Sequence, residues 1–348
     1  MTSATPLDFV APALQGDRRA LARLLTAVED RAAGADQALA ALFPHTGRAW
    51  RIGITGAPGT GKSTLVTALA RHYRAEGRTV GILAVDPTSP FTGGAILGDR
   101  IRMRDLAGDP GVFIRSLAAR GSLGGLSAAA SDLARVLDAC GYEVILVETV
   151  GAGQNEVAIA AMAQTTVVVD APGLGDEVQA IKAGILEIAD VLAVNKADQP
   201  GARHAVRALR TMIETGHPAA RNGLFAHHGR MLAAPVPEIA GSPLWVPPII
   251  ETVAVTGRGV AELAVAIEQY RRHLNGSGEL TAIERQQIAL ELLDRMRETL
   301  AARLLGQLPD DAIAQAAASV QQRDLDPAAA VERLITAAGW PVAEAVQL

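Results

Sequence analysis

The chain has 348 residues and a formal net charge of −5, and its residues are 49% hydrophobic, 20% charged and 3% aromatic. This composition excludes a disordered chain, and the charge argues against nucleic acid or an anionic membrane as a partner. A single cysteine, Cys140, excludes internal disulfides and multi-cysteine metal sites. Since no apolar run reaches the ~18–20 residues of a membrane span and the start is not leader-like, we expect a cytoplasmic protein.

The chain opens with a region of helical character. Leu21, Leu24 and Val28 recur at helical spacing, and an alanine-rich run continues the pattern. We therefore predict an N-terminal helical extension over residues 1–46.

A second region, residues 47–275, alternates short β-rich runs with helical stretches. That pattern is typical of a mainly parallel sheet flanked by helices on both faces, an α/β fold, and apolar runs indicate strands buried on both sides. The predicted strands are residues 51–55, 79–86, 111–116, 143–149, 165–171, 191–195 and 249–255. The proline-rich residues 216–248 predict a loop with one short helix.

The third region, residues 276–348, follows a flexible break predicted at Asn275–Gly278. It is predicted to hold one long helix and two shorter ones, at 310–322 and 326–338. One face of the long helix is apolar at every fourth residue, with Leu293 alongside: Ile288, Leu292, Met296, Leu300 and Leu304. Because such a region has little core of its own, its stripe needs a partner, either a second copy of the chain or the sheet domain.

A phosphate-binding motif follows the first predicted strand. Gly56-Ala57-Pro58-Gly59-Thr60-Gly61-Lys62-Ser63 fits G-x-x-x-x-G-K-[ST], and Thr64 continues into a helix. In this motif backbone N–H groups surround the β-phosphate, Lys62 reaches the β- and γ-phosphate oxygens, and Ser63 binds Mg²⁺. The order of strand, loop and helix argues against a chance glycine-rich turn.

A base-binding motif follows the strand predicted at 191–195. Asn195-Lys196-Ala197-Asp198 fits N-K-x-D, in which Asp198 accepts from both N1–H and N2–H₂ of guanine. Lys196 lies along the base, and Asn195 ties this loop to the phosphate loop. Adenine lacks that donor pair and would leave the carboxylate unpaired, at a cost of about 1–3 kcal/mol, so we predict GTP over ATP.

Lysine is rare in this chain, and two of its three lysines lie in the two motifs just described. Only three of the 32 basic residues are lysines, at Lys62, Lys182 and Lys196, and the rest are arginines. An ammonium and a guanidinium are not interchangeable where geometry matters, so all three lysines are candidate functional residues.

Acidic residues at other strand ends are candidates for the metal site. Glu148 ends one strand, Asp86 ends another, and Asp99 lies in the loop after Asp86. Each could instead be a helix cap or a surface acid. Mg²⁺ keeps several waters, so we expect some of these acids to act through water.

Three further residues are catalytic candidates. Arg102 or Arg104 could reach the γ-phosphate, unless both are solvated cations on a helix face. Gln154 could orient the attacking water.

Taken together, these motifs closely resemble those of the MeaB/ArgK and MMAA-type GTPases. The resemblance covers about residues 45–270 and rests on five segments in order: GITGAPGTGKST, VDPTSPFTGGAILGDRIRM, ETVGAGQNE, PGLGDEVQAIKAGILEIADVLAVNKAD and W-V-P-P. It implies a P-loop NTPase fold that uses GTP or GDP and Mg²⁺. It also implies a nucleotide and Mg²⁺ set made of Lys62, Ser63, Asp86, Asp99 and Glu148.

The resemblance further implies a partner. GTPases of this kind service adenosylcobalamin-dependent acyl-CoA mutases, so we expect a GTP-hydrolysing chaperone that gates cofactor loading and protects or reactivates the mutase. The chain itself is not expected to bind cobalamin. The loop from Pro172 to Lys182 would be the family's extra switch, signalling to the mutase through Gln179 and Lys182. The family also forms homodimers through its C-terminal helices, which agrees with the apolar stripe.

One departure and two alternatives stand beside this interpretation. The usual serine of the second base-contact loop is absent from Thr252–Thr256, so a contact would come from the backbone N–H of Ala254 or Val255. A GTP-dependent kinase is one alternative. A metallochaperone GTPase is the other, disfavoured because such proteins usually carry Cys/His clusters.

Overall fold

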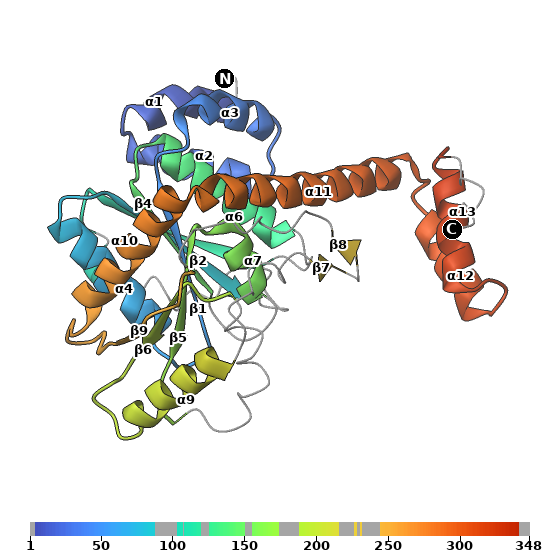
Figure 1. Cartoon of the computed structure of the whole chain (residues 1–348). Helices are drawn as coiled ribbons and strands as arrows, with labels where there is room; N and C mark the ends of the chain where they lie inside the picture. The colour runs from blue at the N-terminus through green and yellow to red at the C-terminus, as the bar shows by residue number, and fades with distance from the viewer. Residues whose placement is uncertain are drawn as a thin grey trace. The chain divides into compact units, whose positions relative to one another are not determined.

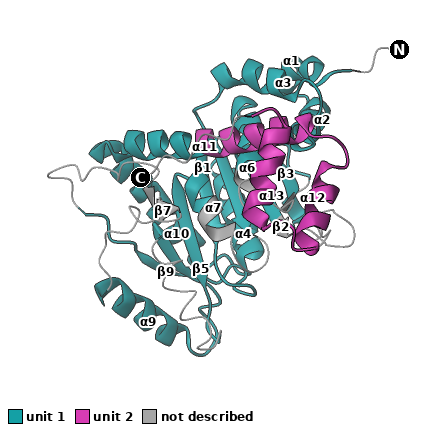
Figure 2. Ribbon diagram, turned by 90° about the vertical axis from the view of Figure 1, so that its right-hand side faces the viewer, with its two compact units in different colours: residues 1–291 teal, residues 292–348 magenta. Residues whose placement is uncertain are grey.

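The computed structural model describes residues 4–87, 103–106, 108–119, 125–149, 155–173, 188–215, 226–227, 230–231 and 244–340. The chain divides into two compact units, residues 1–291 and 292–348, which Figure 2 draws in different colours. The sequence predicted three regions, with boundaries after residues 46 and 275. The division into two units does not test those boundaries, so they stay a prediction.

A seven-stranded parallel sheet forms the centre of the first unit (Figure 1). Its strand order is β3-β2-β4-β1-β5-β6-β9. All seven predicted strands are present, at β1 (Trp50–Thr55), β2 (Val80–Pro87), β3 (Val112–Ala119), β4 (Val144–Thr149), β5 (Thr165–Asp170), β6 (Val191–Val194) and β9 (Ile249–Glu251). The last strand is shorter than predicted, because Thr252 to Val255 leave the sheet to contact the base-binding loop.

Helices cover both faces of the sheet. One face carries α4 (Lys62–Ala75) and α10 (Val260–Ser277), and the other carries α6 (Gly125–Ala139), α7 (Asn155–Met162) and α9 (Ala202–Thr215). Within β2, Ile82 packs into the first layer while Leu83 and Val85 pack into the second. Burial on both sides explains why the strands are mostly apolar.

The N-terminal segment is helical, as predicted. Its elements are η1 (Pro6–Phe9), α1 (Val10–Leu14), α2 (Arg18–Glu29), α3 (Ala35–Leu42) and η2 (Phe43–His45). The side chains of Leu21, Leu24 and Val28 are buried, and α2 and α3 pack against α6. The extension therefore adds a helical layer outside α6 and shares its core.

One carboxylate holds the connection from this extension into β1. Asp138, near the end of α6, accepts hydrogen bonds from the backbone N–H groups of Gly47 (2.6 Å), Arg48 (3.1 Å) and Ala49 (2.9 Å). The charged acceptor thus fixes the three residues that precede the central strand.

Replacing Asp138 with alanine should lower the free energy of unfolding by about 1–3 kcal/mol, since three amides lose a charged acceptor and the partly exposed ones regain water. The measurement is the urea unfolding midpoint by circular dichroism. Asp310→Ala, which removes an exposed carboxylate, is the matched control. Equal midpoints for the two variants would contradict the assignment.

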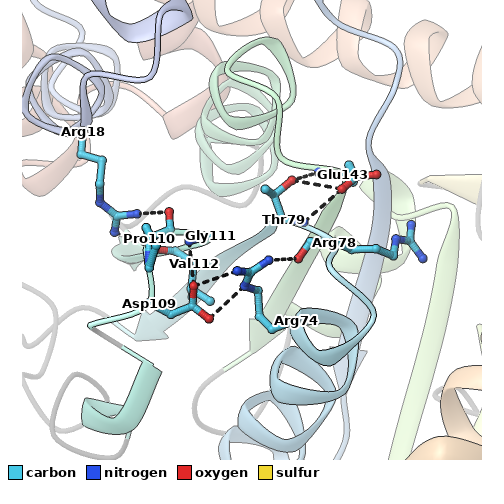
Figure 3. A network of polar contacts seen from close by, with 9 residues as sticks. All are labelled: Arg18, Arg74, Arg78, Thr79, Asp109, Pro110, Gly111, Val112 and Glu143. Carbon is cyan, nitrogen blue, oxygen red and sulfur yellow. Dashed lines mark hydrogen bonds and ion pairs between the residues drawn. The ribbon is translucent and has the colours of Figure 1, made fainter.

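A second polar cluster joins α4 to the start of β3 (Figure 3). Arg74 donates to both carboxylate oxygens of Asp109, at 2.9 and 3.0 Å, and to the carbonyl of Arg78 at 2.6 Å. Arg18 of α2 donates to the carbonyls of Pro110 and Val112, each at 2.7 Å. The cluster therefore connects the extension, the helix after the phosphate-binding segment and an outer strand.

This cluster should make the free energy of unfolding depend on pH. The Arg74 guanidinium, and then the N–H of Gly111, hold the pKa of Asp109 below its usual value. The stability that this carboxylate adds is complete above its unfolded pKa of about 4 and is lost as pH falls through the lower folded pKa. Wild type should therefore exceed Asp109→Asn in urea midpoint from pH 7 to 5, and the gap should close below about pH 4. A gap independent of pH would exclude an ionised Asp109 as its source.

The C-terminal helices are α11 (Glu279–Gln307), α12 (Ala312–Gln321) and α13 (Pro327–Ala337), which confirms one long and two short helices. The flexible break expected at Asn275–Gly278 is wrong in extent. Helix α10 continues through Ser277, with Leu274 buried on its inner face, and only Gly278, at φ +79°, separates it from α11.

The first turns of α11, up to Glu291, contact the first unit through Ile283, which is buried in its core, and through polar side chains. Gln287 donates to the carbonyl of Ala163 at 2.8 Å, Glu284 accepts from Gln164 at 3.2 Å, and Glu291 pairs with Arg135. The predicted apolar positions Ile288, Leu292 and Met296 are each more than half exposed. These three positions of the stripe are therefore exposed along α11.

The remaining described segments are short. In the proline-rich region, where a loop with one short helix was predicted, the described residues include β7 (Ala226–His227) and β8 (Arg230–Met231), which form an antiparallel pair. A 3₁₀ turn, η3 (Arg104–Leu106), precedes β3. Among the described helices, none combines the length and apolar character needed to cross a membrane.

Candidate nucleotide-binding site

The predicted phosphate loop joins the end of β1 to the start of α4. Gly56, Gly59 and Gly61 have φ of +138°, +80° and +88°, values that favour glycine. A Cβ on Gly56 would lie 2.1 Å from the carbonyl oxygen of Val169 on β5. The glycines therefore allow the loop to turn tightly against the neighbouring strand.

Lys62 and Ser63 occupy the first turn of α4, where unpaired backbone N–H groups and the helix dipole favour an anion. The Lys62 ammonium is buried and donates to the carbonyls of Gly56 (2.7 Å) and Ala57 (3.1 Å). The loop thus concentrates positive charge at the carboxyl end of β1.

The structure brings two predicted metal ligands together. Ser63 Oγ donates to Glu148 Oε1 at 2.5 Å, and both side chains are buried. The contact follows from the sheet, because Glu148 on β4 is in register with Ile54 on the adjacent β1. A hydroxyl and a carboxylate in one buried place are the hard oxygen donors that Mg²⁺ prefers, so these residues fit the predicted ion.

The other residues predicted for the metal site, for catalysis and for the switch are only partly described. In β2, Ala84 is in register with Glu148, which places the backbone of Asp86 at the same edge of the sheet. The side chains of Asp86 and Arg104 lie outside what the structure describes, as do residues Asp99, Arg102, Gln154, Gln179 and Lys182.

The base motif is attached directly to the phosphate loop. Asn195 Nδ2 donates to the carbonyl of Thr60 at 2.8 Å, and Lys196 Nζ donates to the carbonyl of Gly59 at 2.8 Å. A Cβ on Gly61 would lie 2.5 Å from Asn195 Nδ2, so glycine is also needed for this contact. Asp198 is exposed at the tip of the same loop. The predicted tie through Asn195 is present, and Lys196 supplies a second one.

The segment after β9 has a different role from the one expected. The N–H of Ala254 donates to Asn195 Oδ1 at 3.1 Å, so this amide supports the base loop and is not directed to a base. Thr252, which is buried, donates its hydroxyl to the same oxygen at 3.2 Å. This role of Thr252 was not predicted, because the sequence placed Thr252 inside the strand expected at 249–255. Val255 is 86% exposed.

Comparison with known proteins places these features in one family. Residues 21–308 match the family model described as methylmalonyl Co-A mutase-associated GTPase MeaB. A putative GTPase of Pyrococcus horikoshii is 45% identical over 95% of this chain and 98% of its own length. The GTPase ArgK of Escherichia coli is 38% identical over 86% of this chain and 85% of its own. A solved structure of a protein called LAO/AO transport system kinase aligns with a TM-score of 0.63 at 27% identity, covering 97% of this chain and 98% of its own.

Proposed function

Since the chain belongs to the MeaB family and is a P-loop GTPase, we propose that it acts as a GTP-hydrolysing chaperone of an adenosylcobalamin-dependent acyl-CoA mutase. In this role it gates cofactor loading and protects or reactivates the mutase, while binding no cobalamin itself. The family description, which associates these GTPases with methylmalonyl-CoA mutase, supports the choice of partner.

The observation that carries the nucleotide assignment is the pair of bonds between the two loops. Thr60 and Gly59 of the phosphate loop accept from Asn195 and Lys196 of the base loop. We propose that one guanine nucleotide spans both loops, with residues 56–64 around its phosphates. Asp198 then accepts from the guanine ring, and Val255 rather than Ala254 supplies the backbone contact from the segment after β9.

Hydrolysis on this site is water attack on the γ-phosphate, with no covalent protein intermediate. Lys62 and the first N–H groups of α4 stabilise the charge that develops on the phosphate oxygens. Ser63 and Glu148 hold Mg²⁺ in this proposal, directly or through water, with Asp86 and Asp99 completing the set. Bound there, Mg²⁺ supplies charge neutralisation of the phosphates. Arg102 is assigned to the γ-phosphate and Gln154 to the attacking water.

Signalling to the partner is assigned to Gln179 and Lys182. Lys182→Ala should keep basal GTP hydrolysis within about twofold and lose most of the stimulation by the mutase, because the residue contacts the partner and not the nucleotide. Phosphate release with and without purified mutase measures both rates. A fall in the basal rate would instead place Lys182 among the catalytic residues.

The same assay separates the two alternatives. One aligned solved structure bears the name of a kinase, so γ-labelled GTP should be followed into both free phosphate and any labelled acceptor. A labelled acceptor would favour the kinase. Against a metallochaperone, the described residues contain no group of three metal-ligating side chains, and burial raises the pKa of Cys140 to about 11. A stoichiometric Ni²⁺ or Zn²⁺ site in equilibrium dialysis would restore that alternative.

We also propose a homodimer through the C-terminal helices. The exposed stripe of α11, formed by Ile288, Leu292 and Met296, supports it, since water-exposed apolar rows of this length are uncommon in monomers. In a sedimentation experiment, we expect wild type to be a dimer and the double variant Leu292→Glu/Met296→Glu to be a monomer. A monomeric wild type would contradict it.

A further inference from the structure

Helix α9 carries an exposed row of three arginines. Arg203, Arg207 and Arg210 follow one another at spacings of four and three residues, so they share one side of the helix. A different side, with Ala202 and Leu209 buried, packs on the sheet. Figures 1 and 2 both place α9 at the periphery of the first unit, with no other described helix on its outer side.

The charge pattern of this helix is unfavourable for its own stability. Like charges three and four residues apart repel, and Arg203 and His204 stand in the first turn, where the helix dipole favours acids. The first turn holds no acid, the last turn holds no base, and Glu214 lies at the C-terminal end. A pattern that opposes stability at both ends is expected where a surface is used for binding.

These arginines also differ from several others in their contacts. Within the described residues, Arg203, Arg207 and Arg210 take part in no ion pair, whereas Arg74, Arg115 and Arg135 each bind a carboxylate. Glu214, four residues after Arg210, is the acid nearest in sequence to the row and forms no ion pair with it in that part of the chain. The row is therefore a local positive surface on a chain whose net charge is −5.

From this charge pattern we infer that the arginine row of α9 is a docking surface for an acidic face of a partner protein. The row extends from Arg203 to Arg210, seven residue steps of about 1.5 Å each, so it is about 10 Å long, which is too long for one phosphate group and suits a line of carboxylates. The negative charge of the whole chain disfavours nucleic acid as the occupant.

The position of α9 connects this surface to the nucleotide site. The helix begins four residues after Asp198, and a Cβ on Gly201 would lie 3.6 Å from Pro172, the first residue of the predicted switch loop. A protein docked on the row would therefore lie near Pro172, the residue at which that loop starts. Resting on the proposed function, the partner is the mutase, which docks on α9 while the switch signals to it.

The test uses full-length protein and two matched double variants. Arg203→Glu/Arg207→Glu changes the row, and Arg19→Glu/Arg285→Glu makes the same charge change at exposed positions elsewhere. Each protein is titrated with a 20-residue polyglutamate peptide, with a DNA duplex of equal charge and with the mutase, at about 50 and 200 mM salt. The row variant should keep or raise its melting temperature, because acids replace bases in the first turns of α9.

The affinities for polyglutamate and for the mutase should fall at least about tenfold in the row variant and much less in the control variant. The affinities that remain in the row variant should also depend less on salt than those of wild type. Equal losses in the two variants, or no loss in either, would overturn the inference, and so would tighter binding to DNA through the same arginines. If the row variant alone loses polyglutamate while wild type shows no affinity for the mutase, the surface stands and the proposed partner fails.

Discussion

Replacing Lys62 with alanine should lower the affinity for GTP and GDP at least a hundredfold. The ammonium is buried in the phosphate loop, where it donates to the carbonyls of Gly56 and Ala57. With nucleotide bound, we expect those donors to turn to phosphate oxygens, and two charge-assisted hydrogen bonds of about 1.5–3 kcal/mol each correspond to a factor of more than 100 in affinity. Titration calorimetry with GDP measures the loss.

Two controls keep this result interpretable. Arg285→Ala removes an exposed cation of α11 and should leave affinity unchanged. Lys62→Arg keeps the charge but replaces a compact ammonium with a planar group in a buried place, so it should also bind weakly. A Lys62→Ala protein that folds and binds GDP as tightly as wild type would remove the phosphate-loop assignment.

Replacing Asp198 with asparagine should change which base is accepted. The carboxylate is an acceptor for both guanine donors, whereas the amide offers one acceptor and one donor, which fits the N1–H and O2 of xanthine. Wild type should prefer GTP over XTP, and Asp198→Asn should prefer XTP by at least about tenfold, since a mispaired buried polar group costs about 1–3 kcal/mol. Competition against a fluorescent nucleotide gives both affinities.

Asn195→Ala is the informative comparison for that variant. Asn195 holds the base loop to Thr60 and to the segment after β9, so its loss should weaken GTP and XTP together and leave the ratio unchanged. If Asp198→Asn also weakened both nucleotides without changing their ratio, its role would be support of the loop and not base recognition.

The strands could be predicted because the sheet imposes a strong pattern. Residues 80–85 and 144–147 are buried on both sides, and all of them except Gly81 are apolar. The site motifs were equally readable, because Lys62, Ser63 and Asn195 act through side chains that few other residues replace. Register then places Glu148 next to Ser63, a contact that strand ends alone could only suggest.

The features that escaped prediction involve the backbone or depend on tertiary packing. The tie through Asn195 was predicted, but the second tie, from Lys196 to the carbonyl of Gly59, was not, because a carbonyl leaves no trace in residue type. The N–H of Ala254 was one of two candidates for a contact with the base, and the Asn195 side chain takes it. At the end of α10, the glycine-rich composition indicated a loop, while burial of Leu274 keeps the chain helical through Ser277.

Because lysine is scarce in this chain, chemical modification of its amines can be used to probe the nucleotide site. It has three side-chain amines, and two of them, on Lys62 and Lys196, lie on carbonyl oxygens of the phosphate loop. Apart from the α-amine of the chain and Lys182, acylating reagents such as succinimidyl esters would therefore modify amines only where nucleotide is expected, and protection of Lys62 and Lys196 by GTP, read by mass spectrometry, would report occupancy of that site. Immobilisation on a sensor chip through amine coupling would for the same reason obstruct it, so tethering should use a terminal tag.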